Sequence, residues 1–261
     1  MDSSNMIYLL HIPKTGGTSI QAMLQEYAAR TGKRIVGANL VDDLIGRDVE
    51  NWTSADILHG HLGSLPLEMV ADVKVITVLR DPVTHLHSWY RHVLRAPDHY
   101  FHQAVVSQGI GFADWLDWPP ARMLVDNPQA RYLGTHALMA GAASKFGGSL
   151  QETWELGEPA LNREELESAA RRTLSEALAV GCLDQLADFQ VQLAAILAFE
   201  PERTFQENVN PNAAEEISAD LAARIINELC PIDAALHESC RTGRFPASDE
   251  WLSRRPTRSQ Q

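Results

Sequence analysis

The sequence is poor in cysteine and in basic residues. Its three cysteines, Cys182, Cys230 and Cys240, are odd in number and have no Cys-x-x-Cys spacing, so neither a disulfide framework nor a zinc ribbon is indicated. Free thiols in a reducing cytosol are the simplest account. Lysine and arginine number 22 against 34 aspartates and glutamates, which gives a formal net charge of −12. This balance argues against general nucleic-acid binding, which needs a basic surface.

A long hydrophobic run is also missing at the N-terminus. Residues 6–10 form a short apolar stretch, too short for a signal-peptide core or a membrane span. We therefore expect a cytoplasmic protein with no stable membrane anchor. A chain of 261 residues with 45% hydrophobic content can bury a large core. We expect one α/β domain over residues 1–252 and a disordered tail over 253–261.

The most informative segment that is present follows this apolar stretch. Residues 11–19 read His-Ile-Pro-Lys-Thr-Gly-Gly-Thr-Ser and lead into an amphipathic stretch at 20–30. A buried strand that turns through glycines into a helix directs several backbone N–H groups at one point, backed by the positive end of the helix dipole. We expect this turn to bind a phosphate-like anion. The candidate residues are Lys14, Thr15, Gly16, Gly17, Thr18 and Ser19.

The position of the lysine distinguishes this turn from the ATP-binding Walker A loop. In a Walker A loop the lysine follows the glycines, whereas Lys14 precedes Gly16 and Gly17. The ATP and Mg²⁺ interpretation thereby loses its main support. A glycine-rich turn that binds nothing remains the simplest alternative.

A second strand, turn and helix unit is expected at residues 73–95. The run at 73–79 is almost continuously apolar and β-branched, as in a strand buried on both faces of a parallel sheet. It ends at Arg80-Asp81-Pro82, where the proline favours the start of a helix that carries Ser88. Arg80 is expected to face the same crevice as Lys14, and Arg80 and Ser88 could converge on one phosphate. A structural salt bridge from Arg80 to a nearby carboxylate is the alternative.

The third motif is His59-Gly60-His61, which directly follows a short apolar run. A histidine with a pKa near neutrality suits proton abstraction from an acceptor hydroxyl. Two alternatives stand beside this role: the two histidines could chelate a metal, although no third ligand is evident, or His59 could be a core residue. The remaining histidines are expected to be ordinary surface residues of helices, and they include His85, His87, His92, His99 and His102.

The three motifs resemble those of sulfotransferases that use 3′-phosphoadenosine 5′-phosphosulfate (PAPS), especially the family of heparan sulfate 2-O-sulfotransferase and related carbohydrate sulfotransferases. The family loop has the form Pro-Lys-Thr-x-x-Thr-Ser, as at residues 13–19. Weaker similarity at 127–133, 180–183, 208–210 and 233–236 extends the match over about residues 6–242. The chain departs from the family at His85, where an arginine is usual. Animal Golgi members carry a membrane anchor, so its absence suggests a bacterial-type soluble enzyme.

This resemblance implies a P-loop nucleotide-kinase-like, three-layer α/β fold with a mainly parallel sheet. It implies PAPS as co-substrate, no metal, and a hydroxyl-bearing acceptor such as a glycan or small molecule. Lys14 and the loop would hold the 5′-phosphosulfate, Arg80 and Ser88 the 3′-phosphate, and His61, supported by His59, would act as base. An ATP-dependent kinase and a non-catalytic nucleotide-binding protein remain alternatives.

The spacing of apolar residues predicts the other elements. Asp184 is expected to cap a helix that reaches about residue 199, and residues 141–159 are expected to form a flexible segment or lid. Further helices are predicted near 111–118 and at 18–30, 128–133, 162–178, 213–229 and 232–241, and short strands at 34–37, 57–58 and 179–183.

Overall fold

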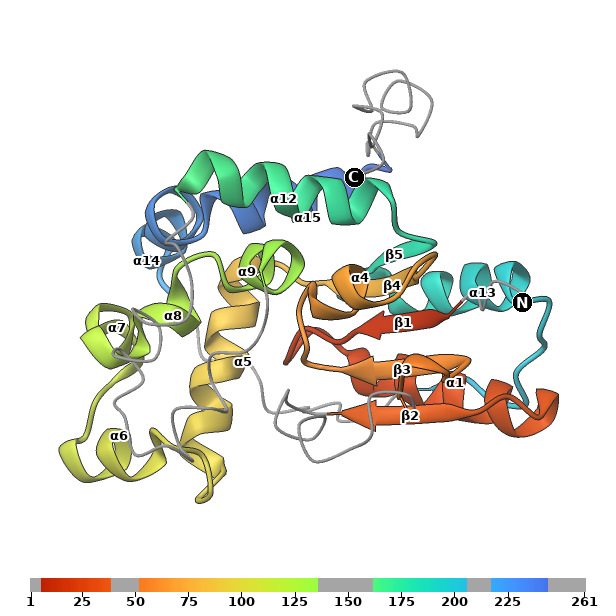
Figure 1. Ribbon diagram of the computed structural model, residues 1–261. Helices are drawn as coiled ribbons and strands as arrows, with labels where there is room; N and C mark the ends of the chain where they lie inside the picture. Colours follow the sequence, from red (N-terminus) through yellow and green to blue (C-terminus); the bar gives the residue numbers. More distant parts are fainter. Residues whose placement is uncertain (1–5, 39–51, 136–161, 206–216, 244–261) are drawn as a thin grey trace.

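A computed structural model describes residues 6–38, 52–135, 162–205 and 217–243 (Figure 1). The predicted lid at 141–159 and the predicted tail at 253–261 lie outside the described residues. Among the described residues, no helix combines the length and the apolar character that a bilayer crossing requires.

The core of the fold is a sheet of five parallel strands in the order β2-β3-β1-β4-β5. Their bounds are β1 Ile7–Leu10, β2 Ile35–Ala38, β3 Ile57–Gly60, β4 Lys74–Leu79 and β5 Ala179–Cys182. The predicted α/β fold with a central parallel sheet flanked by helices is therefore confirmed.

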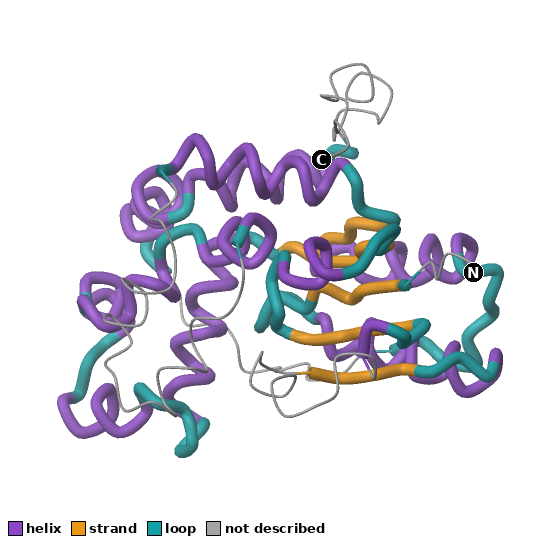
Figure 2. Tube along the Cα trace, viewed as in Figure 1, coloured by secondary structure: helices purple, strands orange, loops and turns teal. Residues whose placement is uncertain are grey.

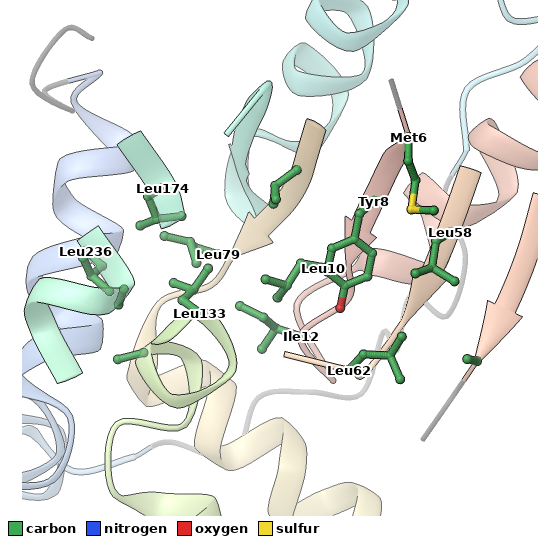
Figure 3. Packing of buried hydrophobic residues seen from close by; sticks show 14 of the residues in the cluster. Met6, Tyr8, Leu10, Ile12, Leu58, Leu62, Leu79, Leu133, Leu174 and Leu236 are labelled. Atoms are coloured by element: carbon green, nitrogen blue, oxygen red, sulfur yellow. The ribbon is translucent and has the colours of Figure 1, made fainter. Parts of the chain in front are cut away.

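Helices cover both faces of the sheet, which explains why its central strands are almost wholly apolar. Tyr8 and Leu10 of β1 face the side covered by α9 (Pro128–Gly134), α12 (Arg163–Ser175) and α15 (Pro231–Arg241) (Figure 3). Alternate strand residues face the other side, where α1 (Gly17–Thr31) and α13 (Leu186–Ile196) pack (Figure 1). Each face thus has its own hydrophobic cluster.

A third hydrophobic cluster joins helices that lie beside the sheet. These helices lie beyond the arrowheads of β1, β2 and β3 in Figure 1, and Figure 2 shows the same separation of the helices from the strands. Leu86 and Trp89 of α5 pack there with Trp115, and Ile225 of a π-helical turn closes the cluster. This helical region places α5 next to the carboxyl edge of the sheet. Its helices are α5 Pro82–Arg95, α6 His102–Gln108, α7 Phe112–Asp117, α8 Arg122–Val125 and α14 Ala219–Arg224, and a 3₁₀ turn spans Pro119–Ala121.

Local capping explains where several helices begin. Asn162 caps α12: its Oδ1 accepts from the N–H of Glu165 at 2.9 Å, and its own N–H donates to Glu165 Oε2 at 3.1 Å. This helix ends before the predicted residue 178 because the N–H of Leu178 donates to the carbonyl of Val75 in the sheet at 2.8 Å. Short α4 (Leu65–Met69) follows β3.

The predicted cap of α13 is wrong. Asp184 does not cap this helix, because Leu183–Gln185 forms a 3₁₀ turn first and Gln185 takes the capping position without a side-chain hydrogen bond. The helix start predicted at residue 213 lies outside the described residues. Within them α14 begins at Ala219, where the hydroxyl of Ser218 accepts from the N–H of Leu221 at 3.3 Å and caps the helix.

Candidate functional site

The three sequence motifs leave three neighbouring strands at one edge of the sheet. The loop with Lys14 follows β1, His61 follows β3 on one side of it, and Arg80 follows β4 on the other. Because all three strands are parallel, their carboxyl ends meet at the same edge, which is where ligands bind in open α/β sheets. The topology therefore brings the three motifs together.

The loop itself is a tight turn with two left-handed residues. Gly16 has a φ of +88° at the N-cap of α1, and Lys14 has a φ of +69°. Left-handed backbone is uncommon for a residue with a side chain, so Lys14 is held in a strained conformation, as residues at ligand-binding turns often are. The buried hydroxyl of Thr15 donates to the carbonyl of Ile12 at 2.9 Å and fastens the turn.

The loop offers unsatisfied hydrogen-bond donors. Within the described chain no acceptor engages the N–H groups of Thr15, Gly16, Gly17 and Thr18. The sequence predicts that Ser19 also binds the anion, but its N–H donates to the carbonyl of Gly16 at 3.0 Å. Four N–H groups at the start of a 15-residue helix form a site for an anion.

Two cations flank these donors. Nη1 of Arg80 donates to the carbonyl of Lys14 at 2.9 Å, and Nε donates to Oγ1 of Thr84 at 3.1 Å. Asp81 does not pair with Arg80 but caps α5 by accepting from the N–H of Thr84 at 2.9 Å. Among the described residues neither Lys14 nor Arg80 has a carboxylate within ion-pair distance. The structure therefore shows no salt bridge from Arg80 to a described carboxylate, although the charge of nearby Asp81 opposes the lowering of the Arg80 pKa.

Burial changes the ionisation of these two groups in the same direction. It lowers the pKa of Lys14, and the charges of Arg95 and Arg80 lower it further. Burial also lowers the pKa of Arg80, whose guanidinium nevertheless stays charged. An anion bound here would be attracted because neither cation has a carboxylate within ion-pair distance in the described part of the chain.

Buried hydrogen bonds of Gln129 and Asp233 hold Arg80 in place. The side chain of Gln129 accepts from the N–H of Arg80 at 2.9 Å and donates to its carbonyl at 2.8 Å. Asp233 on α15 accepts from the N–H groups of Gln129 at 3.0 Å and Ala130 at 2.7 Å. Burial raises the pKa of this fully enclosed carboxyl to about 7. Gln129 and Asp233 lie in segments that sequence similarity had marked only weakly.

His61 has a defined tautomer. Its Nδ1 lies 2.5 Å from the carbonyl oxygen of His11, and since that oxygen can only accept, Nδ1 carries the proton and Nε2 keeps its lone pair. The rings of His61 and His11 lie 4.5 Å apart. Burial lowers the pKa of His61, against the opposing effect of the His11 carbonyl. A neutral imidazole with a free Nε2 can take a proton.

His59 lies on the face of the sheet that α1 covers and its ring covers Gly37 of the neighbouring strand. A Cβ at Gly37 would come within 2.6 Å of the His59 ring. The His59 side chain is half-buried, and burial lowers its pKa, followed by the charge of His61. Among the described residues, the group of side chains that could together hold a metal ion does not include these histidines. His11, His59 and His61 therefore do not form a convergent ligand set.

Two histidines of the site were not predicted. His85 was expected at the surface but is fully buried, and its Nε2 donates to the carbonyl of Pro13 at 2.8 Å. Burial lowers the pKa of His85 to about 3, so the ring is neutral and fastens the loop. His11 packs against Gly17, where a Cβ would lie 2.0 Å from its Cδ2. His85 lies on the buried side of α5 with Leu86 and Trp89. Its position on this apolar face of the predicted helix is the sequence signal that could have indicated its burial.

Ser88 lies on α5, at the end of the second turn of the helix. It is half-buried, and in the described part of the chain its hydroxyl has no hydrogen-bond partner. Thr18, at the start of α1, is exposed. Neither hydroxyl is engaged by another residue of the described chain, and Ser88 follows Arg80 by eight positions on the helix after β4.

Comparison with solved structures finds distant similarity in fold, without a match in sequence. No protein-family model matches the sequence, and no curated protein matches it. The fold is similar to the crystal structure of a sulfotransferase from Alicyclobacillus acidocaldarius, with a TM-score of 0.47 and 14% identity over 89% of this chain and 95% of the other. A match this distant assigns no activity to the chain.

Proposed function

We propose that this protein transfers the sulfuryl group of PAPS to an acceptor hydroxyl and releases adenosine 3′,5′-bisphosphate. The contact of Arg80 with the Lys14 carbonyl at 2.9 Å carries the proposal. It joins two cation-bearing strand ends into one site, and PAPS has two separate phosphate groups to occupy them. The donors are four loop N–H groups, Lys14, Arg80 and Ser88.

The loop would hold the 5′-phosphosulfate. In the transfer step the acceptor oxygen forms a bond to sulfur while the bond between sulfur and the bridging phosphate oxygen breaks. The electron pair of that bond stays on the phosphate oxygen. Lys14 and the N–H groups of Thr15, Gly16, Gly17 and Thr18 would stabilise the negative charge that develops there.

His61 would take the proton of the acceptor hydroxyl. Its Nε2 carries the lone pair for this step, and the Nδ1–H bond to the His11 carbonyl stabilises the imidazolium that forms. His59, two residues before His61 and within reach of its charge, would support His61. The acceptor is a hydroxyl-bearing molecule, with a glycan or small molecule favoured and a nucleic acid disfavoured by the acidic chain.

Arg80 and Ser88 would bind the 3′-phosphate, the group that separates PAPS from ATP. Arg80 uses Nε and one N–H of Nη1 within the protein, so three of its five donors remain for a ligand. The site needs no acidic ligand for Mg²⁺ in this scheme. An ATP-dependent kinase would need one, which gives a direct way to separate the two activities.

Calorimetric titration tests this proposal. Adenosine 3′,5′-bisphosphate should bind at least tenfold more tightly than ADP, or than ATP with Mg²⁺, a difference of about 1.4 kcal/mol. Arg80→Ala should remove the preference, whereas Arg172→Ala on the exposed face of α12 should retain it. Preference for ATP, or equal binding in wild type and Arg80→Ala, would overturn the proposal.

A further inference from the structure

A second cluster of ligand-type side chains lies where β5 ends, beside the proposed nucleotide site. One ligand atom each of Cys182, Asp184 and His237 lies within 4.8 Å of the other two. The Cys240 thiol lies next to this group, close enough to Cys182 for the two thiols to change each other's pKa. The group itself therefore presents one sulfur, one imidazole and one carboxylate, with a second sulfur beside it.

The fold builds this cluster from two short patterns. Cys182 is the last residue of β5, and Asp184 follows it in the 3₁₀ turn. His237 and Cys240 lie three residues apart on α15, a spacing that places side chains on one face of a helix. The end of β5 and helix α15 contribute two ligand-type side chains each, although Cys182 and His237 are 55 positions apart in the sequence.

One atom of the cluster is weakly partnered for its burial. Cys182 is 2% exposed and His237 9% exposed. The buried Nε2 of His237 lies 3.5 Å from Oδ1 of Asp184 and has no partner with good hydrogen-bond geometry in the described chain, although the nearby Cys182 side chain raises the pKa of His237. Buried polar atoms in native proteins are almost always paired, and an exception calls for an explanation such as an ion.

The cluster is also accessible. A cavity of about 480 Å³ is lined by Cys182 and Cys240, with Gln185 and Gly243 at the same wall. The side chain of Asp184 is 53% exposed. An ion could reach the thiols through the cavity and the carboxylate from solvent, so the site has an entry path.

We propose that Cys182, Asp184, His237 and Cys240 bind a thiophilic divalent transition cation of the zinc class. Thiolate and imidazole ligands select zinc over Mg²⁺ and Ca²⁺, which prefer oxygen. Four protein ligands are typical of structural zinc sites. This proposal does not depend on the proposed transfer reaction.

Such an ion would fasten the turn that supports the phosphate loop. Leu183 and Leu186 pack against Gly16, so closely that a Cβ there would lie 2.6 Å from Leu183 Cδ1. Leu183 stands between the ligands Cys182 and Asp184 in the chain. A cation that joins β5 to α15 would thus fix the packing behind the loop.

Cobalt titration of the full chain tests the site. Chelator-treated, fully reduced protein should bind one Co²⁺, with thiolate-to-cobalt charge-transfer absorption that one equivalent of Zn²⁺ abolishes. Cys182→Ser and Cys240→Ser should each weaken Co²⁺ binding by at least about 100-fold, since even outer partners of metal ligands contribute about 10–100-fold. Cys230→Ser is the matched control, because that buried thiol donates to the Val125 carbonyl at 3.2 Å and a hydroxyl preserves this bond.

A second measurement uses the wild-type chain alone. Zn²⁺ should slow alkylation of Cys182 and Cys240 and leave the rate at Cys230 unchanged. Absence of a thiolate-to-cobalt band in fully reduced protein, or a band that persists in the Cys182→Ser/Cys240→Ser double variant, would overturn the proposal. A Cys182–Cys240 disulfide that survives reductant would also overturn it, in favour of a redox pair.

Discussion

The carboxyl edge of the sheet carries two clusters of opposite electrostatic character. At β1 and β4, four N–H groups without an acceptor in the described chain lie with Lys14 and Arg80, and no described carboxylate lies within ion-pair distance of either cation. At β5, the side chains of Cys182, Asp184 and His237 present sulfur, oxygen and nitrogen atoms that can bind a cation. The first cluster therefore attracts anions, although the chain has a net charge of −12, and the second attracts metal ions.

The same helix supports both clusters. Asp233 in the first turn of α15 holds the segment that positions Arg80, while His237 and Cys240 in its later turns face β5. Leu183 links the clusters from the other side by packing on Gly16. Substitutions can therefore separate the chemistry of the first cluster from the support that α15 gives to both.

The largest effect should come from removing the base of the first cluster. His61→Ala should lower kcat for sulfuryl transfer by about 10²–10⁴, the usual contribution of a positioned proton acceptor. Binding of the bisphosphate, thermal unfolding and Co²⁺ binding should stay close to wild type. A variant with wild-type turnover would contradict the assignment of His61 as base, and His102→Ala on distant α6 serves as the control.

A smaller effect is expected from the shared helix. Asp233→Asn leaves one acceptor oxygen for two buried N–H groups, those of Gln129 and Ala130, so one donor loses its partner. We expect a loss of about 1–3 kcal/mol in unfolding free energy, measured by urea denaturation. Bisphosphate binding should weaken because Gln129 clamps Arg80.

Retained Co²⁺ binding in Asp233→Asn would show that the two clusters can be uncoupled along α15. The exposed Asp220→Asn on α14 is the matched control and should leave unfolding nearly unchanged. Equal destabilisation by both substitutions would show that the buried hydrogen bonds of Asp233 contribute no particular stability.

The two clusters also differ in how far the sequence predicts them. The first depends on contiguous segments: the loop at 11–19, the turn after β4, and His59 to His61. Parallel pairing then brings these segments to one edge, and a buried apolar run such as β4 predicts that pairing. The fold and the neighbourhood of Lys14 and Arg80 could therefore be predicted from local patterns.

The second cluster could not be predicted in this way. Cys182 and Cys240 were expected to be free thiols because their spacing matches no metal motif, and their meeting depends on how α15 packs on the sheet. His85 was missed for a related reason, since its partner is a carbonyl 72 positions away. Long-range side-chain contacts of this kind follow from tertiary packing, not from spacing along the chain.

The pH dependence of turnover should give the smallest but most specific contrast. A base acts only when neutral, and burial lowers the pKa of His61 below the ordinary histidine value of about 6.5. As the pH falls from 8, kcat at saturating nucleotide should thus stay level through neutrality and decline only below about 6.5. Saturating nucleotide is needed because protonation of Asp233, whose pKa burial raises to about 7, would act on nucleotide binding.

His11 and Tyr132, whose rings face His61, carry no charge near neutrality, because burial lowers the pKa of His11 to about 3 and raises that of Tyr132. Burial also lowers the pKa of His59, so His59 is neutral near neutrality as well. His61→Ala should lose the acidic decline in its residual activity, whereas wild type should keep it. A decline that begins at or above pH 7 would mean that another group titrates, and the anion-binding cluster would then need a different base.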